Sequence, residues 1–374
     1  MVSISLSGPA GGLLRRLAKR AVKDGTVVYL VGGCVRDAVL KTNDGQDVDL
    51  VLETDPAPLA RHCAKLLNAP CEAFGRFGTL RVLGKDLRVD FAASRKEEYP
   101  EPADLPVVSP AQLEVDLFRR DFTINAMAVE VTAKGPGKVI DPYGGLADLK
   151  ARRLRVLHPQ SFRDDPTRVF RAARFLCRFG FKPGAGLLES AQTALSRGHA
   201  AKLSRHRLLQ ELLSVLDEKD PGPALRKLKG WGYLQLIHPG LGVRARGKNA
   251  GERLASLALA LGAEGESFLK SLPLERVRAS ELHEALALVR EKASPRRAPS
   301  SLAARVVKTA LPALPAAALK PLWIGGDDLQ KLGVAPGKDY RGILDAAARE
   351  QWKGKIASRK QALAWLRRRL SVRP

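Results

Sequence analysis

The stretch of residues 29–52, YLVGGCVRDAVLKTNDGQDVDLVL, decides the fold of the first part of the chain. It starts inside an apolar run, residues 27–31, that predicts a short buried strand. A glycine pair and an amphipathic helical segment follow, and a polar loop then leads into a second predicted strand at residues 47–52. This alternation of strand, helix and strand indicates a mixed α/β domain.

Two aspartates open the second predicted strand. Because side chains alternate between the two faces of a strand, Asp47 and Asp49 are expected on the same face, a few ångströms apart. Two carboxylates this close repel each other, and burying them costs free energy unless a cation lies between them. Oxygen ligands beside a glycine turn and an arginine suit Mg²⁺ with bound phosphates. The sequence therefore predicts catalytic metal ligands at Asp47 and Asp49.

A third carboxylate would complete a two-metal site, and Asp90 is the best candidate. It lies in an alternating segment, residues 87–91, that is expected to pair with residues 81–83 around a turn at Gly84-Lys85-Asp86. An ordinary salt bridge is the alternative role for this carboxylate.

The glycine pair Gly32-Gly33 lies at the predicted strand-to-helix turn. Glycines let backbone N–H groups approach a phosphate closely, and the N-terminus of the following helix adds a favourable dipole. Arg36 is expected to reach the phosphates, with Asp37 holding that arginine or capping a helix. A purely structural turn is the alternative, since the chain has neither the GxGxxG nor the GxxxxGK pattern.

The segment RRDFTIN, residues 119–125, combines two cations, a carboxylate and an amide beside apolar positions. Asp121 and Asn125 are four residues apart and would share one face of a helix. That face is expected to bind ribose hydroxyls while Arg120 binds phosphate. A capped helix start with a solvated basic pair is the alternative.

A strong helix is predicted to open at RDDPTR, residues 163–168, where a proline follows two acidic residues. Asp165 and Arg168 are placed to face the Watson–Crick edge of a base. The carboxylate would accept from the exocyclic amine of cytosine or adenine and the arginine would donate to the adjacent ring nitrogen, so guanine and uracil would be rejected. Arg171 and Arg174 continue the basic side of this helix, toward phosphate or water.

Composition indicates the class of partner. The 374 residues carry a net charge of +24 and 5% aromatic residues, so a polyanion such as nucleic acid is expected, bound without much stacking on aromatic rings. The four cysteines have no zinc spacing, and no signal peptide or apolar span is evident, which favours a cytoplasmic protein away from the membrane. From about residue 165 onward, nearly every segment has a helical pattern.

Taken together, the motifs resemble the class II tRNA nucleotidyltransferase and bacterial poly(A) polymerase family. The resemblance covers residues 27–213 and rests, in chain order, on LVGGCVRD with DVDLV, RVDFAASR, RRDFTINAMA, DPYGGLADL, RDDPTRVFRAARFLCRFGF and RHRLLQELL. It implies an α+β fold with a polymerase-β-like nucleotidyltransferase head at residues 1–148. An all-α remainder is implied as well, with a base-recognising neck at 149–218 and a tRNA-binding body and tail at 219–374.

The resemblance also implies an activity, the template-independent addition of C and A nucleotides (CCA) to the 3′ end of tRNA from CTP and ATP, with Mg²⁺ as cofactor. The family's metal, ribose and base motifs match, in that order, Asp47 and Asp49, Asp121 and Asn125, and Asp165 and Arg168. The family usually has Glu where this chain has Asp164, one methylene shorter. Little effect is expected beyond the geometry of the helix start.

Within the family, addition of A alone and poly(A) polymerisation are the alternatives. The stretch GRFGTLR at 75–81 looks more like the CCA-adding type than like a poly(A) polymerase. Residues 95–116 supply the flexible loop that members adding only CC lack, which favours CCA or A-only addition. A non-catalytic RNA-binding protein on the same scaffold is the rival from another class. The presence of both the metal carboxylates and the base-reading pair argues against it.

Overall fold

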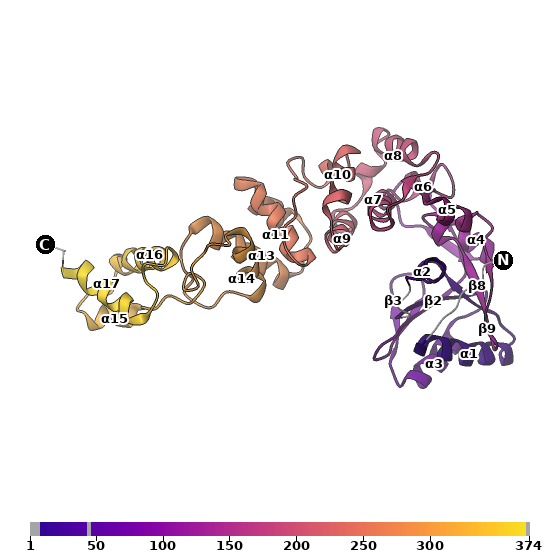
Figure 1. Ribbon diagram of the computed structural model, residues 1–374, viewed down its shortest axis with the longest axis horizontal. Coiled ribbons are helices and arrows are strands. Elements are labelled where there is room, and N and C mark those ends of the chain that lie inside the picture. The colour runs from indigo at the N-terminus through magenta and orange to yellow at the C-terminus, as the bar shows by residue number, and fades with distance from the viewer. Residues whose placement is uncertain (1–7, 43–45, 372–374) are drawn as a thin grey trace. The chain divides into compact units, whose positions relative to one another are not determined.

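The computed structural model describes residues 8–42 and 46–371. It forms two compact units, one ending at Leu203 and the other beginning at Ser204. Along the chain, sheet and helices come first and helices alone follow (Figure 1). The predicted α/β head with an all-helical remainder is thereby confirmed. The boundary between the units falls inside the predicted neck, and the division at residues 148 and 218 stays a prediction.

The first unit is built on a seven-stranded sheet in the order β3-β4-β5-β2-β1-β8-β9. Its strands are β1 Val28–Val31, β2 Asp47–Leu52, β3 Cys71–Phe74, β4 Thr79–Leu83, β5 Arg88–Ala93, β8 Ala128–Thr132 and β9 Gly135–Ile140. β2 and β5 pair in parallel, whereas the other neighbouring pairs of this sheet are antiparallel. The predicted pairing of the segments on either side of residues 84–86 is confirmed as β4 with β5.

One face of the sheet is covered by two helices that pack on each other, α1 (Gly8–Lys23) and α3 (Ala57–Leu67). The apolar row Val48, Val89 and Val82 runs across three strands on this face and is at most 4% exposed. Since side chains alternate along each strand, the polar residues next to these valines point to the opposite face.

The opposite face is covered in part by α2 (Gly33–Leu40) and α4 (Leu113–Phe118). Leu113 and Leu117 of α4 form a buried cluster with Val31, Val51 and Ala128 of the sheet. Figure 1 shows α2 on one side of the sheet and α1 with α3 on the other. The starts of β2 and β5, where the charged residues are, lie outside this cluster.

The rest of the first unit forms short elements around the sheet. They are the hairpin β6 Arg95–Glu98 with β7 Val107–Pro110, the 3₁₀ helices η1 Thr123–Asn125 and η2 Ala200–Lys202, the helices α5 Gly145–Ala151, α6 Ser161–Asp164, α7 Thr167–Phe179 and α8 Leu187–Ser196, and the parallel pair β10 Arg153–Leu154 with β11 Lys182–Pro183. The predicted loop at 95–116 is therefore partly a hairpin, whose strands enclose residues 99–106.

The second unit is helical throughout its described part. Its α-helices are α9 Arg205–Leu216, α10 Gly222–Gly230, α11 Ala250–Ala260, α12 Gly265–Ser271, α13 Arg276–Glu291, α14 Ser301–Ala310, α15 Gly326–Lys331, α16 Lys338–Trp352 and α17 Arg359–Ser371. Arg253 of α11 donates to the carbonyls of Leu216 and Glu218, which satisfies acceptors left open where α9 ends. Among the described residues, no helix combines the length and the apolar character needed to span a bilayer.

Candidate active site

The two predicted metal carboxylates lie at the start of β2, and the strand register sets their neighbours. Asp47 stands opposite Arg88 of β5, and Asp49 stands opposite Asp90. The Asp47 side chain is 61% exposed and forms an ion pair of 3.1 Å with Arg88, whereas Asp49 is half-buried. Asp47 and Asp49 thus share a face, as the strand period predicts, and Asp90 adds a third carboxylate beside them.

Burial and charge act against each other at Asp49. Burial raises the pKa of this carboxyl and the Asp90 carboxylate raises it further, while the Arg120 guanidinium lowers it. A divalent cation would remove this conflict because it stabilises the ionised form. Mg²⁺ is commonly held by one or two carboxylates together with waters and substrate phosphates. Asp47 and Asp49 fit that ligand set, although the described residues contain no group of three or more metal-binding side chains.

Asp90 has a strong partner of its own. Arg81 of β4 donates to both carboxylate oxygens of Asp90, from Nε and Nη2, at 2.7 Å each. The same guanidinium stacks on Phe74, 3.3 Å from the ring centroid. The structure therefore gives Asp90 the salt bridge that was the alternative role for this residue. Ligation of a metal by Asp90 stays a prediction.

The glycine turn lies against Arg120. Gly32 has a φ of +72°, and a Cβ atom built on it would lie 2.8 Å from Nη1 of Arg120. Nη2 of Arg120 donates to the buried carboxylate of Asp116 at 2.9 Å, and the buried Nε has no hydrogen-bond partner among the described residues. A cation with an unused donor thus lies beside a turn of small residues, which is an arrangement suited to phosphate.

The Arg36 guanidinium was expected to reach bound phosphates, but in the structure it is engaged by other side chains. Its Nε and Nη2 donate to the two oxygens of Asp37 at 2.7 Å, and Nη1 donates to Oδ1 of Asn125 at 2.5 Å. The guanidinium is buried, 4.8 Å from the ring centroid of Phe179. All three nitrogens are thereby bound inside the protein. Of the two roles predicted for Asp37, the structure shows the one in which it holds Arg36.

Asp121 and Asn125 meet as the four-residue spacing suggested, although the segment forms a 3₁₀ turn, η1. The amide of Asn125 donates to Oδ1 of Asp121 at 2.9 Å, and Arg171 donates to Oδ2 from Nε and Nη2 at 2.8 and 2.7 Å. Burial alone would raise the pKa of Asp121, but Arg171 and Asn125 outweigh it and lower the pKa. Asp121 is therefore a buried, ionised carboxylate that joins η1 to α7.

The predicted base-reading pair is engaged at the start of α7. Oδ1 of Asp165 accepts from the backbone N–H and the hydroxyl of Thr167, at 3.0 and 2.5 Å. Arg168 is 5% exposed and donates to the hydroxyl of Ser161 and the carbonyl of Arg119, at 2.8 and 2.7 Å. Arg174 stacks over Phe175, 5.3 Å from its ring centroid. Both members of the pair thus hold the ends of α6 and α7 together, and base recognition by them stays a prediction.

One residue central to this site had no sequence signal. Glu97 of β6 accepts from Arg95 at 2.8 Å, from Arg119 at 2.8 Å and from the hydroxyl of Tyr99 at 2.7 Å. Glu97 thereby links the hairpin β6–β7 to the RRDFTIN segment, which begins at Arg119. Glu97 stands in a run of charged residues, and only the fold reveals which of them is buried.

Comparison with known proteins finds a matching domain model and several relatives of this chain. Residues 28–155 match the model of the poly A polymerase head domain. An A-adding tRNA nucleotidyltransferase of Geobacter sulfurreducens is 40% identical over 237 residues, which are 63% of this chain and 27% of that protein. A CC-adding tRNA nucleotidyltransferase of Deinococcus radiodurans is 37% identical over 232 residues, which are 61% of this chain and 59% of that protein. The matched region thus spans about a quarter to three fifths of these relatives.

A solved structure of a CCA-adding enzyme in an apo form extends the likeness to nearly the whole chain. The two share 26% sequence identity and a TM-score of 0.72, with 97% of each chain covered. The polymerase-β-like head followed by helical regions is thereby confirmed. Residues 28–155 thus match the poly A polymerase head domain, and the chain is similar in sequence to tRNA nucleotidyltransferases and in fold to a CCA-adding enzyme.

Proposed function

We propose that this protein adds C and A nucleotides to the 3′ end of tRNA, without a nucleic-acid template, from CTP and ATP. The observation that carries the proposal is the pair Asp47 and Asp49 on one face of β2, with the Arg120 guanidinium beside the Gly32 turn. A relative that adds A and one that adds CC support the acceptor and the reaction class. Similar CCA-adding enzymes have been solved with tRNA and with ATP.

Asp47 and Asp49 would hold Mg²⁺, which when bound activates the RNA 3′-hydroxyl and neutralises charge on the leaving group. The 3′-oxygen forms a bond to the α-phosphorus, the α–β phosphoanhydride bond breaks, and pyrophosphate leaves. Arg120 would bind triphosphate oxygens at the glycine turn, with the buried Asp116 holding its guanidinium in place. Burial favours the neutral form of Asp116, but Arg120 and Arg119 outweigh this effect and lower its pKa. Asp116 therefore stays ionised and holds both arginines in position.

Selection of the nucleotide would use the two groups along η1 and α7. Asp121 and Asn125 would bind the ribose, since they are fixed in position by Arg171 and Arg36. For base recognition, the proposed roles require contacts to be exchanged. Arg168 would leave Ser161 or the carbonyl of Arg119 before it donates to a base, so nucleotide binding would be coupled to a small movement between α6 and α7.

Addition that includes A, either as part of CCA or alone, is favoured over addition of CC alone by the hairpin β6–β7. The hairpin β6–β7 provides the segment that we associate with A addition, and Glu97 anchors it to Arg119 of the RRD segment. Addition of A alone is the second candidate, because a 40% identical relative is an A-adding enzyme.

The test is incorporation on three tRNA transcripts that end before the CCA, after its first C and after both C residues. Each is incubated with Mg²⁺ and all four labelled nucleoside triphosphates, and products are resolved at single-nucleotide length. We expect completion of CCA on all three, followed by a stop. Addition of A on the CC-ended transcript alone would replace the proposal with A-only addition. Long A tracts on any RNA would identify a poly(A) polymerase instead.

A further inference from the structure

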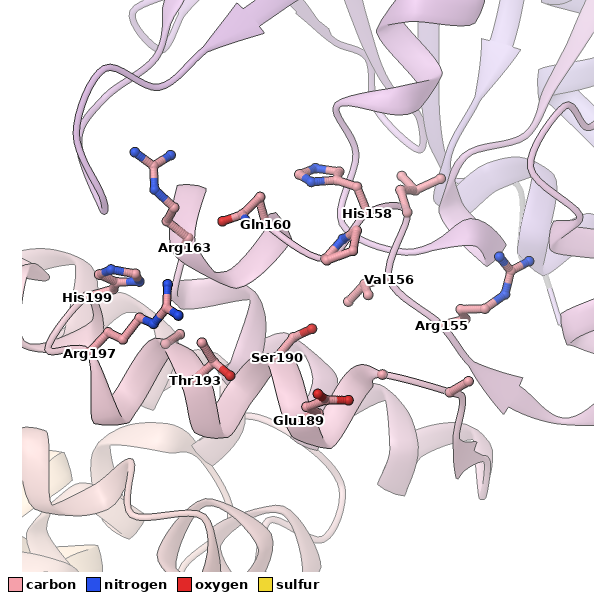
Figure 2. A pocket seen from close by; sticks show the side chains of 15 residues that line it. Arg155, Val156, His158, Gln160, Arg163, Glu189, Ser190, Thr193, Arg197 and His199 are labelled. Carbon is pink, nitrogen blue, oxygen red and sulfur yellow. The ribbon is translucent and has the colours of Figure 1, made fainter.

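A cavity of about 440 Å³ lies in the first unit, away from the carboxylates of β2. Its walls are the segment 155–163, which precedes α7, and one side of α8 (Figure 2). Apolar parts of the wall come from Val156, Pro159 and Ala194. None of the residues proposed for catalysis, ribose binding or base recognition lines it. Cavities of this size hold small organic ligands.

Positive charge is concentrated at one end of the cavity. Figure 2 shows the side chains of Arg163, Arg197 and His199 together there, with the hydroxyl of Thr193 near Arg197. Arg163 has one carboxylate partner, Asp164, at 3.0 Å. Within residues 8–42 and 46–371, no hydrogen bond or ion pair engages the Arg197 side chain. A cation without a protein partner that lines a cavity is available to a bound anion.

His199 gives a second, independent sign of a missing ligand. Its Nδ1 atom is buried and has no hydrogen-bond partner among the described residues. Burial lowers the pKa of His199, and the charges of Arg163, Arg197 and Lys202 lower it further. A buried polar atom without a partner is costly, and like charges gathered around it repel. An anionic oxygen at this end would relieve the repulsion among these charges.

We propose that this cavity binds a phosphate group of a nucleotide unit, with Arg163, Arg197 and His199 as the phosphate ligands. The cavity is larger than a phosphate needs, and the hydroxyls of Ser190 and Thr193 on α8 can bind an attached sugar. Its open, cationic character fits a nucleotide of the RNA strand, which deepens the proposed function and rests on it. A free nucleotide shares the same chemistry and is distinguished below.

The first experiment uses the full chain and a fluorescently labelled tRNA transcript without CCA, in the absence of nucleoside triphosphates. Binding is measured by anisotropy between about 50 and 200 mM salt. Arg197→Gln should weaken binding about five- to tenfold and reduce the slope of log K against log salt by about 0.7 to 0.9, the value for one lost phosphate contact. Arg15→Gln, an exposed arginine of α1, removes the same charge outside the cavity and should change neither.

A second pair of variants adds a negative charge to α8. Thr193→Glu introduces a carboxylate into the wall of the cavity, whereas Gln192→Glu places the same charge on an exposed neighbour that does not line it. Thr193→Glu should weaken tRNA binding at least as much as Arg197→Gln, and Gln192→Glu should have little effect. Both positions are exposed, so neither variant should disturb folding.

Competition experiments identify whether the phosphate belongs to RNA or to a free nucleotide. Pyrophosphate, CMP and AMP are added up to millimolar concentration to the wild-type protein with tRNA. If Arg197→Gln and Thr193→Glu leave tRNA affinity and salt slope unchanged, binding of an RNA phosphate here is refuted. If they instead weaken only the competition by pyrophosphate, CMP or AMP, the ligand is that free compound. Because these measurements need no catalysis, they can fail while the incorporation assay succeeds, and the reverse.

Discussion

At the scale of single residues, Gly32 shows how an absent side chain shapes the site. The left-handed backbone favours glycine here, and the Cβ of any other residue would lie 2.8 Å from Nη1 of Arg120, so this guanidinium would have to shift. The following glycine differs, because the Cβ of an alanine at Gly33 would lie 3.4 Å from Arg36 Nη2, an ordinary contact, and its φ is not positive. The two adjacent glycines therefore form a matched pair for experiment.

Gly32→Ala should destabilise the first unit by about 1–3 kcal/mol, the range for a residue forced into a glycine-only conformation. It should also displace Arg120 and raise the KM for nucleoside triphosphate. Gly33→Ala should change stability by less than about 1 kcal/mol. Native-state hydrogen exchange of β1 and β2 amides measures this, because all four tryptophans lie beyond residue 204 and report on the second unit. Equal effects of the two substitutions would contradict the assigned close approach.

Sequence reasoning at this scale found most of the residues but not their partners. The period of a strand was enough to place Asp47 and Asp49 on one face. Nothing local indicated that Arg36 would be buried on Phe179, which comes from a helix distant in sequence, so this contact depends on tertiary packing. Arg81, by contrast, faces Asp90 across the strand pair that the sequence predicts, and only the bidentate geometry of their salt bridge needed the structure.

At the scale of elements, a buried network joins three helical segments of the first unit. Arg171 of α7 holds Asp121, Asp121 holds Asn125 of η1, and Asn125 accepts from Arg36 of α2. Asp121 is 7% exposed, so its charge depends on these partners. The network fixes the start of α2, and with it the glycine turn, relative to α7.

Replacement of Asp121 by Asn should cost about 1.5–3 kcal/mol near pH 7, since it removes the buried charge that Arg171, whose side chain is 36% exposed, contacts from two nitrogens. The pKa of Asp121 is lowered below its ordinary value of 3.8 in the folded state. Its stabilisation is therefore complete above 3.8 and is lost as pH falls from there through the lower folded-state value. Urea unfolding of the first unit, followed from pH 7 down to pH 3, should show a shallower pH dependence for Asp121→Asn than for the wild type.

The control is Asp24→Asn, which breaks the surface ion pair with Arg20 and should cost less than about 1 kcal/mol. If Asp121→Asn lowered the free energy of unfolding no more than this surface change, the network would not be what holds α2, η1 and α7 together.

Element types were predictable from the sequence more readily than their arrangement. Apolar periodicity predicted the helices α7 to α11 and the strands β1, β2, β4 and β5, because local pattern and burial agree there. The parallel pairing of β2 with β5 brings Asp49 beside Asp90 across two intervening strands and a helix, and no local signal specifies it. The hairpin β6–β7 was expected as a loop, since β6 consists of charged residues, β7 ends at a proline, and each strand has only four residues.

At the scale of the whole molecule, charge and length have separate consequences. A net charge of +24 spread over both units is suited to a long polyanion such as tRNA, whose binding would weaken steeply with salt. The named relatives match about 240 residues of this chain or fewer, whereas a CCA-adding enzyme structure is similar over 97% of it. The helical second unit is therefore shared in fold, while the proposal that it contacts RNA rests on charge.

The central claim is that the carboxylates of β2 carry nucleotide addition, and Asp49→Asn tests it most directly because it removes one charge at nearly constant shape. Single-turnover addition of labelled ATP to CC-ended tRNA is measured with Mg²⁺, alongside tRNA affinity. We predict a loss of rate of about a thousandfold, as expected when several kcal/mol of metal-borne stabilisation is removed, with tRNA affinity nearly unchanged. An Asp49→Asn protein that adds A at close to the wild-type rate would contradict the assignment of this site.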